Sequence, residues 1–405
     1  MRALALVATV ILVAFRPAQK LSYDTEYPVI GYSTTVPTGA IARLHSSLAS
    51  GEVVLEAEAE RGYLKSLLSA LEIPVDSQVL VFSKTSFQVG LISPETPRAI
   101  YFNDDTYVAW VQDGPNLEIA AVDPSLGAVF YTLKQEDVES PRFERKTVLC
   151  LRCHDSTSIS GGGVPRFLMG SGVTDASGRL AYHEGWTLTT DETPIEKRWG
   201  GWYVTGTGAG RAHLGNRTVT PATTGPVEVE IDLASHVDTT RYLGRHSDVV
   251  ALMVLEHQVH VQNVLVRVSW DLRVADGASP IEPIVEPLVK ALLFAGEAPL
   301  TGPIAGSSGF RERFSRRGPR DSRGRSLREL DLVSRLFRYP CSYLIYSEAF
   351  DALPETAKKT IYRRLRDVLD GTDTSEAFAH LSSADRKAIL EILEETKSDL
   401  AAEVR

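Results

Sequence analysis

Five consecutive residues constrain this chain more than any other feature of its sequence. Cys150, Leu151, Arg152, Cys153 and His154 form the pattern C-x-x-C-H. Two thiols at this spacing can each add across one vinyl group of the same porphyrin, and the adjacent imidazole then lies under the ring, where it binds iron. The pattern therefore predicts one covalently attached haem c per chain, held by Cys150 and Cys153, with His154 as the first iron ligand.

Two other interpretations of the motif remain open. A structural zinc ion would accept Cys150, Cys153 and His154, but it needs one or two further ligands, and the only other thiol is the distant Cys341. A thioredoxin-type redox pair expects a strand followed by a helix N-terminus that stabilises a thiolate, whereas this motif comes after the polar run 142–147 and before the polar run 155–158. Cys341 has aromatic and apolar sequence neighbours, which predicts a buried side chain.

Residues 1–20 are predicted to be a signal peptide or an N-terminal anchor. Met1 and Arg2 are followed by a largely apolar run that ends at Phe15, which gives a basic segment and then a hydrophobic segment of signal-peptide length. The small-residue pattern of a cleavage site is missing, so an uncleaved anchor is the alternative. We expect an exported or periplasmic protein, with membrane association through this segment if it is retained.

Length and composition indicate a multi-domain globular protein. The 405 residues exceed the usual span of one core, and the net charge of -9 argues against a nucleic-acid partner. We expect an α+β fold with a β-rich domain at 21–141, a haem-binding domain with a long helix at 142–275, and a helical region at 280–405.

The hydrophobic pattern changes along the chain. In the N-terminal region, short apolar runs separated by turn residues predict an antiparallel sheet or small sandwich. These runs cover residues 79–82, 87–92, 99–102, 107–111, 117–122 and 128–133. Apolar residues at helical spacing predict helices near 61–71, 247–271, 326–337, 354–369 and 383–397.

The stretch from 141 to 224 is poor in periodic segments and rich in glycine, notably at 160–163 and 206–210. Such a composition cannot build a packed core from its own side chains, but it suits backbone that wraps closely around a large flat ligand. We expect the haem to take the place of the missing side-chain core.

The second iron ligand does not follow from the motif. We favour His213, which closes a glycine-rich aromatic stretch, and then His257 on the predicted long helix. For each, an ordinary structural role is an alternative, since a lone imidazole often satisfies local polar groups. The other candidates are His183, His246, His260, Met169 and Met253.

Arginine and tryptophan side chains near the motif are candidates to contact the haem. Arg198 and Arg211, together with Arg166, can pair with the haem propionates, because a guanidinium offers forked donors to carboxylates. Trp202 and Trp199 can stack on the macrocycle or simply pack in the core.

Eight arginines lie between Arg311 and Arg328 in an otherwise acidic chain. Such a local positive field can steer an acidic redox partner protein or contact anionic lipid. The alternative, which we prefer, is a loop whose arginines pair with the chain's own carboxylates.

Most of the chain resembles a family of exported bacterial proteins that carry a single C-x-x-C-H motif. The resemblance rests on residues 77–88, 97–103, 150–154, 198–205, 213–216, 246–248, 255–258, 324–332 and 338–343. It implies a monohaem c-type cytochrome whose haem is attached outside the cytoplasmic membrane. Relatives often carry a further histidine after Thr207, where this chain has Gly208, which favours His213 or His257 as the second ligand.

The sequence therefore predicts an exported c-type cytochrome that transfers single electrons. Two alternatives remain. A peroxidase-like haem enzyme would keep the second iron position open, and a haem-based sensor or binding protein would use the large β and helical regions that a minimal electron carrier does not need.

Overall fold

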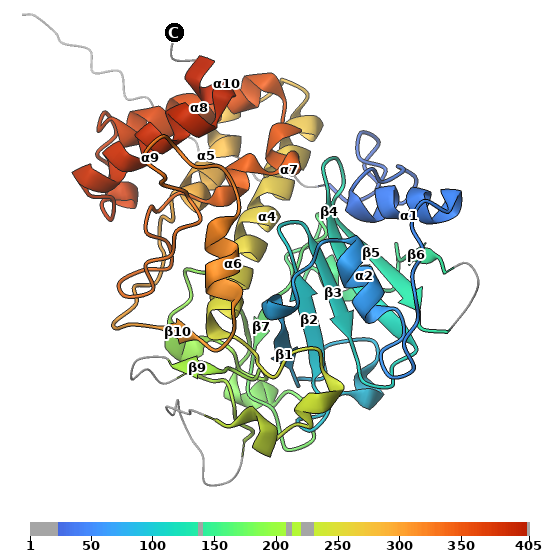
Figure 1. Cartoon of the computed structure of the whole chain (residues 1–405). Helices are drawn as coiled ribbons and strands as arrows, with labels where there is room; N and C mark the ends of the chain where they lie inside the picture. The colour runs from blue at the N-terminus through green and yellow to red at the C-terminus, as the bar shows by residue number, and fades with distance from the viewer. Residues whose placement is uncertain (1–22, 137–140, 208–212, 220–230, 403–405) are drawn as a thin grey trace, which may run out of the picture.

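The computed structural model describes residues 23–136, 141–207, 213–219 and 231–402 (Figure 1). The expected signal segment at 1–20 and the candidate residue Arg211 lie outside these ranges. Within them, an antiparallel sheet from the N-terminal half packs against helices from the C-terminal half. The fold class is α+β, as predicted.

The sheet has six antiparallel strands in sequence order, so each strand pairs with the next along the chain. The strands are β1 (Val79–Val81), β2 (Arg98–Phe102), β3 (Thr106–Trp110), β4 (Asn116–Asp123), β5 (Gly127–Lys134) and β6 (Phe143–Arg145). Two short pairs lie elsewhere, β7 (Gly170–Ser171) with β8 (Thr187–Leu188) and β9 (Gly206–Thr207) with β10 (Ala305–Gly306).

The strand predicted at 87–92 is wrong. This segment contains a 3-10 turn at Val89–Leu91, because the Ser86 hydroxyl accepts a hydrogen bond from the Gln88 backbone N–H. The Gln88 amide in turn donates to the carbonyl of Asn116 at 3.2 Å and fixes the turn against β4. Side-chain hydrogen bonds of this kind compete with strand pairing.

Alternation along the strands gives the sheet two apolar faces. The outer face packs against α1 (Ala40–Ser50) and α2 (Leu64–Ala70) in one buried cluster. The inner face packs against α4 (Val249–Ala275) in a second cluster. Figure 1 shows α2 over the sheet and α4 between the sheet and the C-terminal helices.

The helix α4, predicted near 247–271, begins at Asp248, whose carboxylate accepts hydrogen bonds from the N–H groups of Val250 and Ala251. In the described part of the chain it is the one helix long and apolar enough to cross a membrane, but most of it is buried inside the protein. Its composition is therefore that of a core helix.

The C-terminal region is helical. Its helices are α5 (Ile281–Leu292), α6 (Phe310–Arg316), α7 (Glu348–Asp351), α8 (Glu355–Leu369), α9 (Ser383–Thr396) and α10 (Ser398–Ala402). The helices predicted at 354–369 and 383–397 are confirmed, and the one predicted at 326–337 is wrong. There the Asp331 carboxylate accepts from the N–H groups of Val333 and Ser334, which holds a turn instead.

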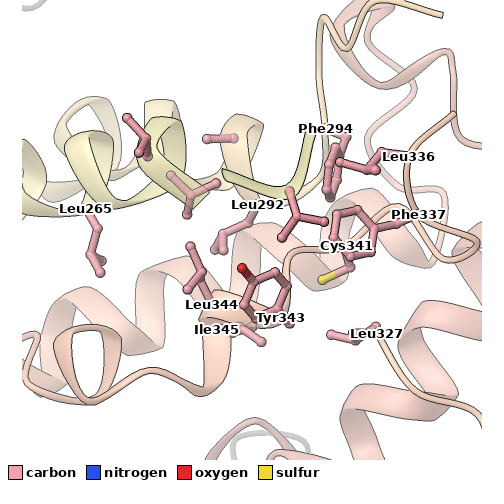
Figure 2. Close-up of a cluster of buried hydrophobic side chains, with 14 of the residues drawn as sticks. Leu265, Leu292, Phe294, Leu327, Leu336, Phe337, Cys341, Tyr343, Leu344 and Ile345 are labelled. Atoms are coloured by element: carbon pink, nitrogen blue, oxygen red, sulfur yellow. The ribbon is translucent and has the colours of Figure 1, made fainter. Parts of the chain in front are cut away.

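Cys341 is fully buried among the aromatic and aliphatic side chains of this region (Figure 2). Burial raises the pKa of its thiol to about 12. The side chain is therefore an apolar core residue, in agreement with its sequence neighbours.

One core cluster joins parts of the chain assigned to three different domains from the sequence. It combines Phe130 of β5, Met169 of the glycine-rich region, Leu255 of α4 and Phe350 of α7. The boundaries near 141 and 275 stay a prediction, and the buried apolar residues are continuous across both.

Candidate functional site

The motif forms a single helical turn, α3 (Leu151–His154), which is the next element after β6. The carbonyl of Cys150 accepts hydrogen bonds from the N–H groups of Cys153 at 3.2 Å and His154 at 3.0 Å. A helical turn brings residues three and four positions apart close together, so Cys153 and His154 are both neighbours of Cys150 along the turn. Both thiols are free, with Cys150 half-buried and Cys153 exposed.

The His154 ring has a defined proton arrangement. Its Nδ1 lies 2.6 Å from the backbone carbonyl oxygen of Arg166. Because a carbonyl only accepts, Nδ1 carries the proton and Nε2 keeps its lone pair. Burial lowers the pKa of His154 to about 4, so the ring is neutral at pH 7. Metal-binding histidines usually donate their other N–H to such an acceptor, so the ring meets the requirements of an iron ligand.

The inner face of the sheet supports this ring. The Phe130 ring on β5 lies 4.2 Å from the His154 ring, centre to centre. The two residues before the motif are apolar yet solvent-exposed, with Val148 75% and Leu149 43% exposed. Adjacent exposed apolar side chains often mark a surface that a ligand covers. The surroundings of the motif therefore fit a large apolar group.

The other two interpretations of the motif have less support. Burial raises the pKa of the Cys150 thiol to about 11, which is opposite to the depressed pKa of a redox-active cysteine. In the described ranges there is no group of three or more His, Cys, Asp or Glu side chains that could hold a metal ion. Cys341 lies in the C-terminal core (Figure 2) and supplies no further ligand to a zinc ion.

The structure places His213 against Trp199. Its ring packs edge-on against Trp199, with 5.3 Å between ring centres, and its Nδ1 accepts a hydrogen bond from the N–H of Gly215 at 3.0 Å. Burial lowers its pKa to about 4, so the ring is neutral with a proton on Nε2. These contacts are local, and none of them joins His213 to the Cys150–His154 turn.

His257 has both ring nitrogens in hydrogen bonds. Its Nδ1 donates to the Asp191 carboxylate at 2.7 Å, and its Nε2 accepts from the Ser342 hydroxyl at 2.8 Å. The ring is fully buried and stacks on Phe294. No lone pair on His257 is therefore available to iron in this structure.

Arg198 and Trp202 are buried with their donors satisfied. Arg198 donates to the Glu256 carboxylate at 2.9 Å and to the carbonyls of Asp191 and Thr193. Trp202 donates its ring N–H to the Gly170 carbonyl at 2.8 Å. The guanidinium of Arg198 thus serves the core rather than a ligand carboxylate.

Arg166 lies close to the motif, because its backbone carbonyl accepts the hydrogen bond from His154. Its side chain is half-buried, and its Nε has no hydrogen-bond partner in the described part of the chain. Burial lowers the pKa of this guanidinium, and the nearby Asp155 carboxylate opposes that effect. Arg166 therefore carries a donor that a ligand carboxylate can use.

Sequence patterns gave no sign of an extended buried network around Asp191. Its second carboxylate oxygen lies 2.5 Å from Nδ1 of His260. Burial opposes ionisation of Asp191, but hydrogen bonds from the two histidines hold its pKa well below the usual range. Asp191, His257 and Ser342 are hydrogen-bonded in the order of a hydrolytic triad, but Ser342 is fully buried. Its hydroxyl oxygen also caps the 3-10 turn Tyr343–Tyr346 by accepting from the Leu344 N–H. The network therefore stabilises the core.

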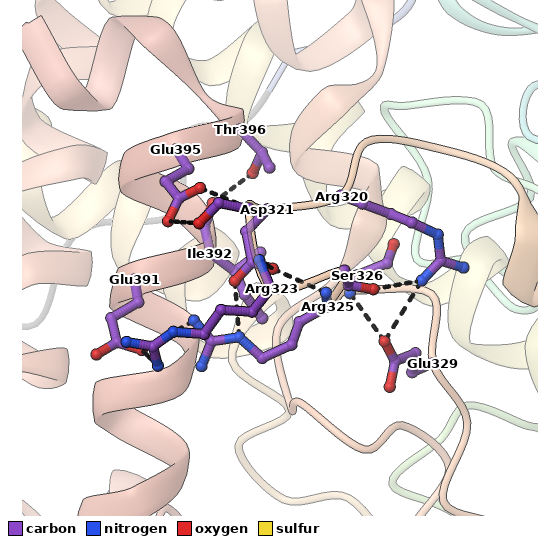
Figure 3. A network of polar contacts seen from close by, with 12 residues as sticks. Arg320, Asp321, Arg323, Arg325, Ser326, Glu329, Glu391, Ile392, Glu395 and Thr396 are labelled. Carbon is purple, nitrogen blue, oxygen red and sulfur yellow. Dashed lines mark hydrogen bonds and ion pairs between the residues drawn. The ribbon is translucent and has the colours of Figure 1, made fainter.

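Most arginines between Arg311 and Arg328 are paired with the chain's own carboxylates, as the preferred alternative predicted. Figure 3 shows Arg325 between Asp321 and Glu391, at 2.7 and 2.8 Å. The other pairs are Arg313 with Asp76, Arg317 and Arg328 with Asp104, Arg320 with Glu329, and Arg323 with Glu391. These ion pairs reduce the positive field that this segment presents to a partner.

Comparison of the chain with protein-family models, with curated proteins and with solved structures finds no match. The family resemblance and the haem therefore stay predictions.

Proposed function

We propose that this chain is an exported c-type cytochrome, which binds one haem through Cys150 and Cys153 and transfers single electrons. The observation that supports it most is the His154 ring, whose Nδ1 proton is fixed by the Arg166 carbonyl. A C-x-x-C-H motif found by chance has no reason to present its histidine in the tautomer that a metal ligand needs.

The residues around the motif would orient the group and exclude water from it. The Arg166 carbonyl prevents rotation of the His154 ring, and Phe130 packs against one side of that ring. When bound, the haem supplies one-electron redox chemistry. Cys150 is partly buried and Cys153 is exposed, so one edge of the site would face a redox partner protein at the surface.

Absorption spectra of the mature protein test this proposal. We expect the oxidised and reduced forms to show low-spin, six-coordinate iron that binds neither carbon monoxide nor cyanide. A high-spin iron that binds these ligands would overturn the electron-carrier assignment and favour the enzyme. Replacing His154 by Ala should abolish the low-spin spectrum, whereas His236→Ala, at an exposed position that is not among the candidate ligands, should leave it unchanged.

A further inference from the structure

An ion pair interrupts the apolar inner face of the sheet. The Arg98 guanidinium on β2 donates from Nη1 to the Glu118 carboxylate on β4 at 3.1 Å. The two side chains are only 13% and 16% exposed. Glu118 also accepts from the side chains of Gln88, at 2.8 Å, and Ser86. Three donors therefore hold this carboxylate in one position.

Arg98 has a donor left over. Its Nε is buried and has no hydrogen-bond partner in the part of the chain that the structure describes. A buried N–H without an acceptor is unfavourable, because it has lost its hydrogen bond to water. A ligand acceptor bound beside this donor can satisfy it.

The pair lies next to the proposed haem ligand. In the register of β4 and β5, Ala120 is opposite Phe130 and Glu118 is opposite Thr132. Glu118 is thus a diagonal neighbour of Phe130 on the same face, at a typical separation of about 7–8 Å. The His154 ring packs directly on Phe130.

The electrostatics agree with this placement. Burial has the largest effect on the pKa of His154. The hydrogen bond to the Arg166 backbone comes second, and the charges of Arg98 and Glu118 follow. Glu118 also raises the pKa of Cys150, second to burial. Both charges are therefore within reach of the motif.

We infer that Arg98 binds a carboxylate of the haem through its Nε–H, and that Glu118 is a positioning residue that holds Arg98 there. This inference rests on the proposed function and adds a residue that the sequence did not single out. A guanidinium fork suits two carboxylates at once, here one from the protein and one from the ligand.

The inference predicts opposite shifts of the reduction potential. Reduction adds one electron to the iron, so a nearby cation favours the reduced form and a nearby anion favours the oxidised form. Arg98→Met should lower the midpoint potential and Glu118→Gln should raise it. Because both side chains are largely buried, each change should alter the equilibrium between reduced and oxidised protein on the order of tenfold. The double variant should lie between the two single variants.

Spectroelectrochemical titration of the haem-loaded protein measures these shifts. Glu144→Gln is the matched control, because Glu144 lies on the same face, two strands from Glu118, but is 65% exposed. Its potential should change by less than a third of the Glu118→Gln shift, since water screens it. Arg98→Lys keeps the charge and should shift the potential by less than half as much as Arg98→Met.

The outcomes separate this inference from the proposed function. A mature protein without haem would overturn the proposed function. A haem-loaded protein whose Arg98 and Glu118 variants shift no more than Glu144→Gln would overturn the inference alone. If Arg98→Met does not fold, Arg98→Lys and Glu118→Gln still decide between the outcomes, with circular dichroism as the check of folding.

Discussion

At the scale of single residues, His154 and His257 show how hydrogen-bond partners determine what a buried imidazole can do. The Nδ1–H of His154 donates a hydrogen bond to a carbonyl, which leaves the lone pair on Nε2 for another partner. His257 uses both nitrogens, one with Asp191 and one with Ser342. The first ring is prepared to bind an added group, whereas the second closes a network inside the protein.

Replacing Asp191 by Asn should destabilise the protein by about 1–3 kcal/mol, since an amide has a single acceptor oxygen and cannot accept from both His257 and His260. Urea unfolding of the mature protein measures this loss. The neighbouring Glu192→Gln, at an exposed side chain, should stay within about 0.5 kcal/mol. Equal effects of the two variants would contradict a stabilising role of the network.

Glu256 should make stability depend on pH. Burial raises its pKa to about 7 from a usual 4.5, against the opposing charge of Arg198, so the folded state binds more protons than the unfolded state between these values. This group should therefore lower the free energy of unfolding as pH rises from about 4.5 to 7, by at most roughly 1.4 kcal/mol per pH unit. The lowered pKa values of His154 and His213 act in the opposite direction below about pH 6.5, so the contribution of Glu256 is read from the difference between wild type and variant.

Glu297 has a raised pKa of about 7 for the same reason and acts in the same direction. In Glu256→Gln the slope of the free energy of unfolding against pH should therefore become more positive, by at most roughly 1.4 kcal/mol per pH unit. Urea unfolding at several pH values measures it. Glu282→Gln, an exposed substitution, serves as the control. An unchanged slope in Glu256→Gln would show that the carboxyl group is not protonated in the folded protein.

The sequence predicted the local part of the site and missed the rest. Cys150, Cys153 and His154 are neighbours in the chain, so their pattern was visible directly. Partners of His257 lie 66 and 85 residues away, and the Arg98–Glu118 pair depends on strand register, so no local pattern reveals them.

At the scale of elements, Asp248 connects α4 to the segment after β10. One carboxylate oxygen caps the helix, and the other accepts from the N–H and hydroxyl of Ser308, at 2.8 and 2.7 Å. This fully buried side chain therefore fixes both the start of the helix and a distant loop.

Replacing Asp248 by Ala should lower the free energy of unfolding by about 2 kcal/mol, the upper end for helix caps, because both sets of donors lose their acceptor. Ser382→Ala at the capping box of α9 removes a more exposed cap and should cost about 1 kcal/mol. Chemical denaturation compares the two variants. A smaller loss for Asp248→Ala than for Ser382→Ala would contradict the double role of Asp248.

Long periodic elements were predictable and short irregular ones were not. The spacing of apolar residues located α4, α8 and α9 to within a few residues. The errors at 87–92 and 326–337 share one cause, namely serine and aspartate oxygens that accept from nearby backbone N–H groups. Such bonds depend on which rotamers the surrounding packing permits.

At the scale of the whole molecule, the sheet and the C-terminal helices share one core through α4. Residues of the glycine-rich region, such as Trp199 and Trp202, belong to the same cluster. Because the core is shared, unfolding one part alone would expose the apolar surface of the other part and is unfavourable.

The sheet, the glycine-rich region and the C-terminal helices should therefore unfold together. We expect tryptophan fluorescence and far-ultraviolet circular dichroism to report coincident transitions in urea. Leu292→Ala in α5 should lower both midpoints equally, with a loss of about 2–5 kcal/mol. Two separate transitions, with only one moved by this substitution, would instead support independent domains.

The intact mass of the mature protein, purified from a host that attaches haem c and washed with acidified acetone, tests the central claim most directly. Two thioether bonds to Cys150 and Cys153 predict a mass increased by one haem, and Cys150→Ser with Cys153→Ser should lose that increment. A wild-type mass equal to that of the polypeptide alone would contradict the account.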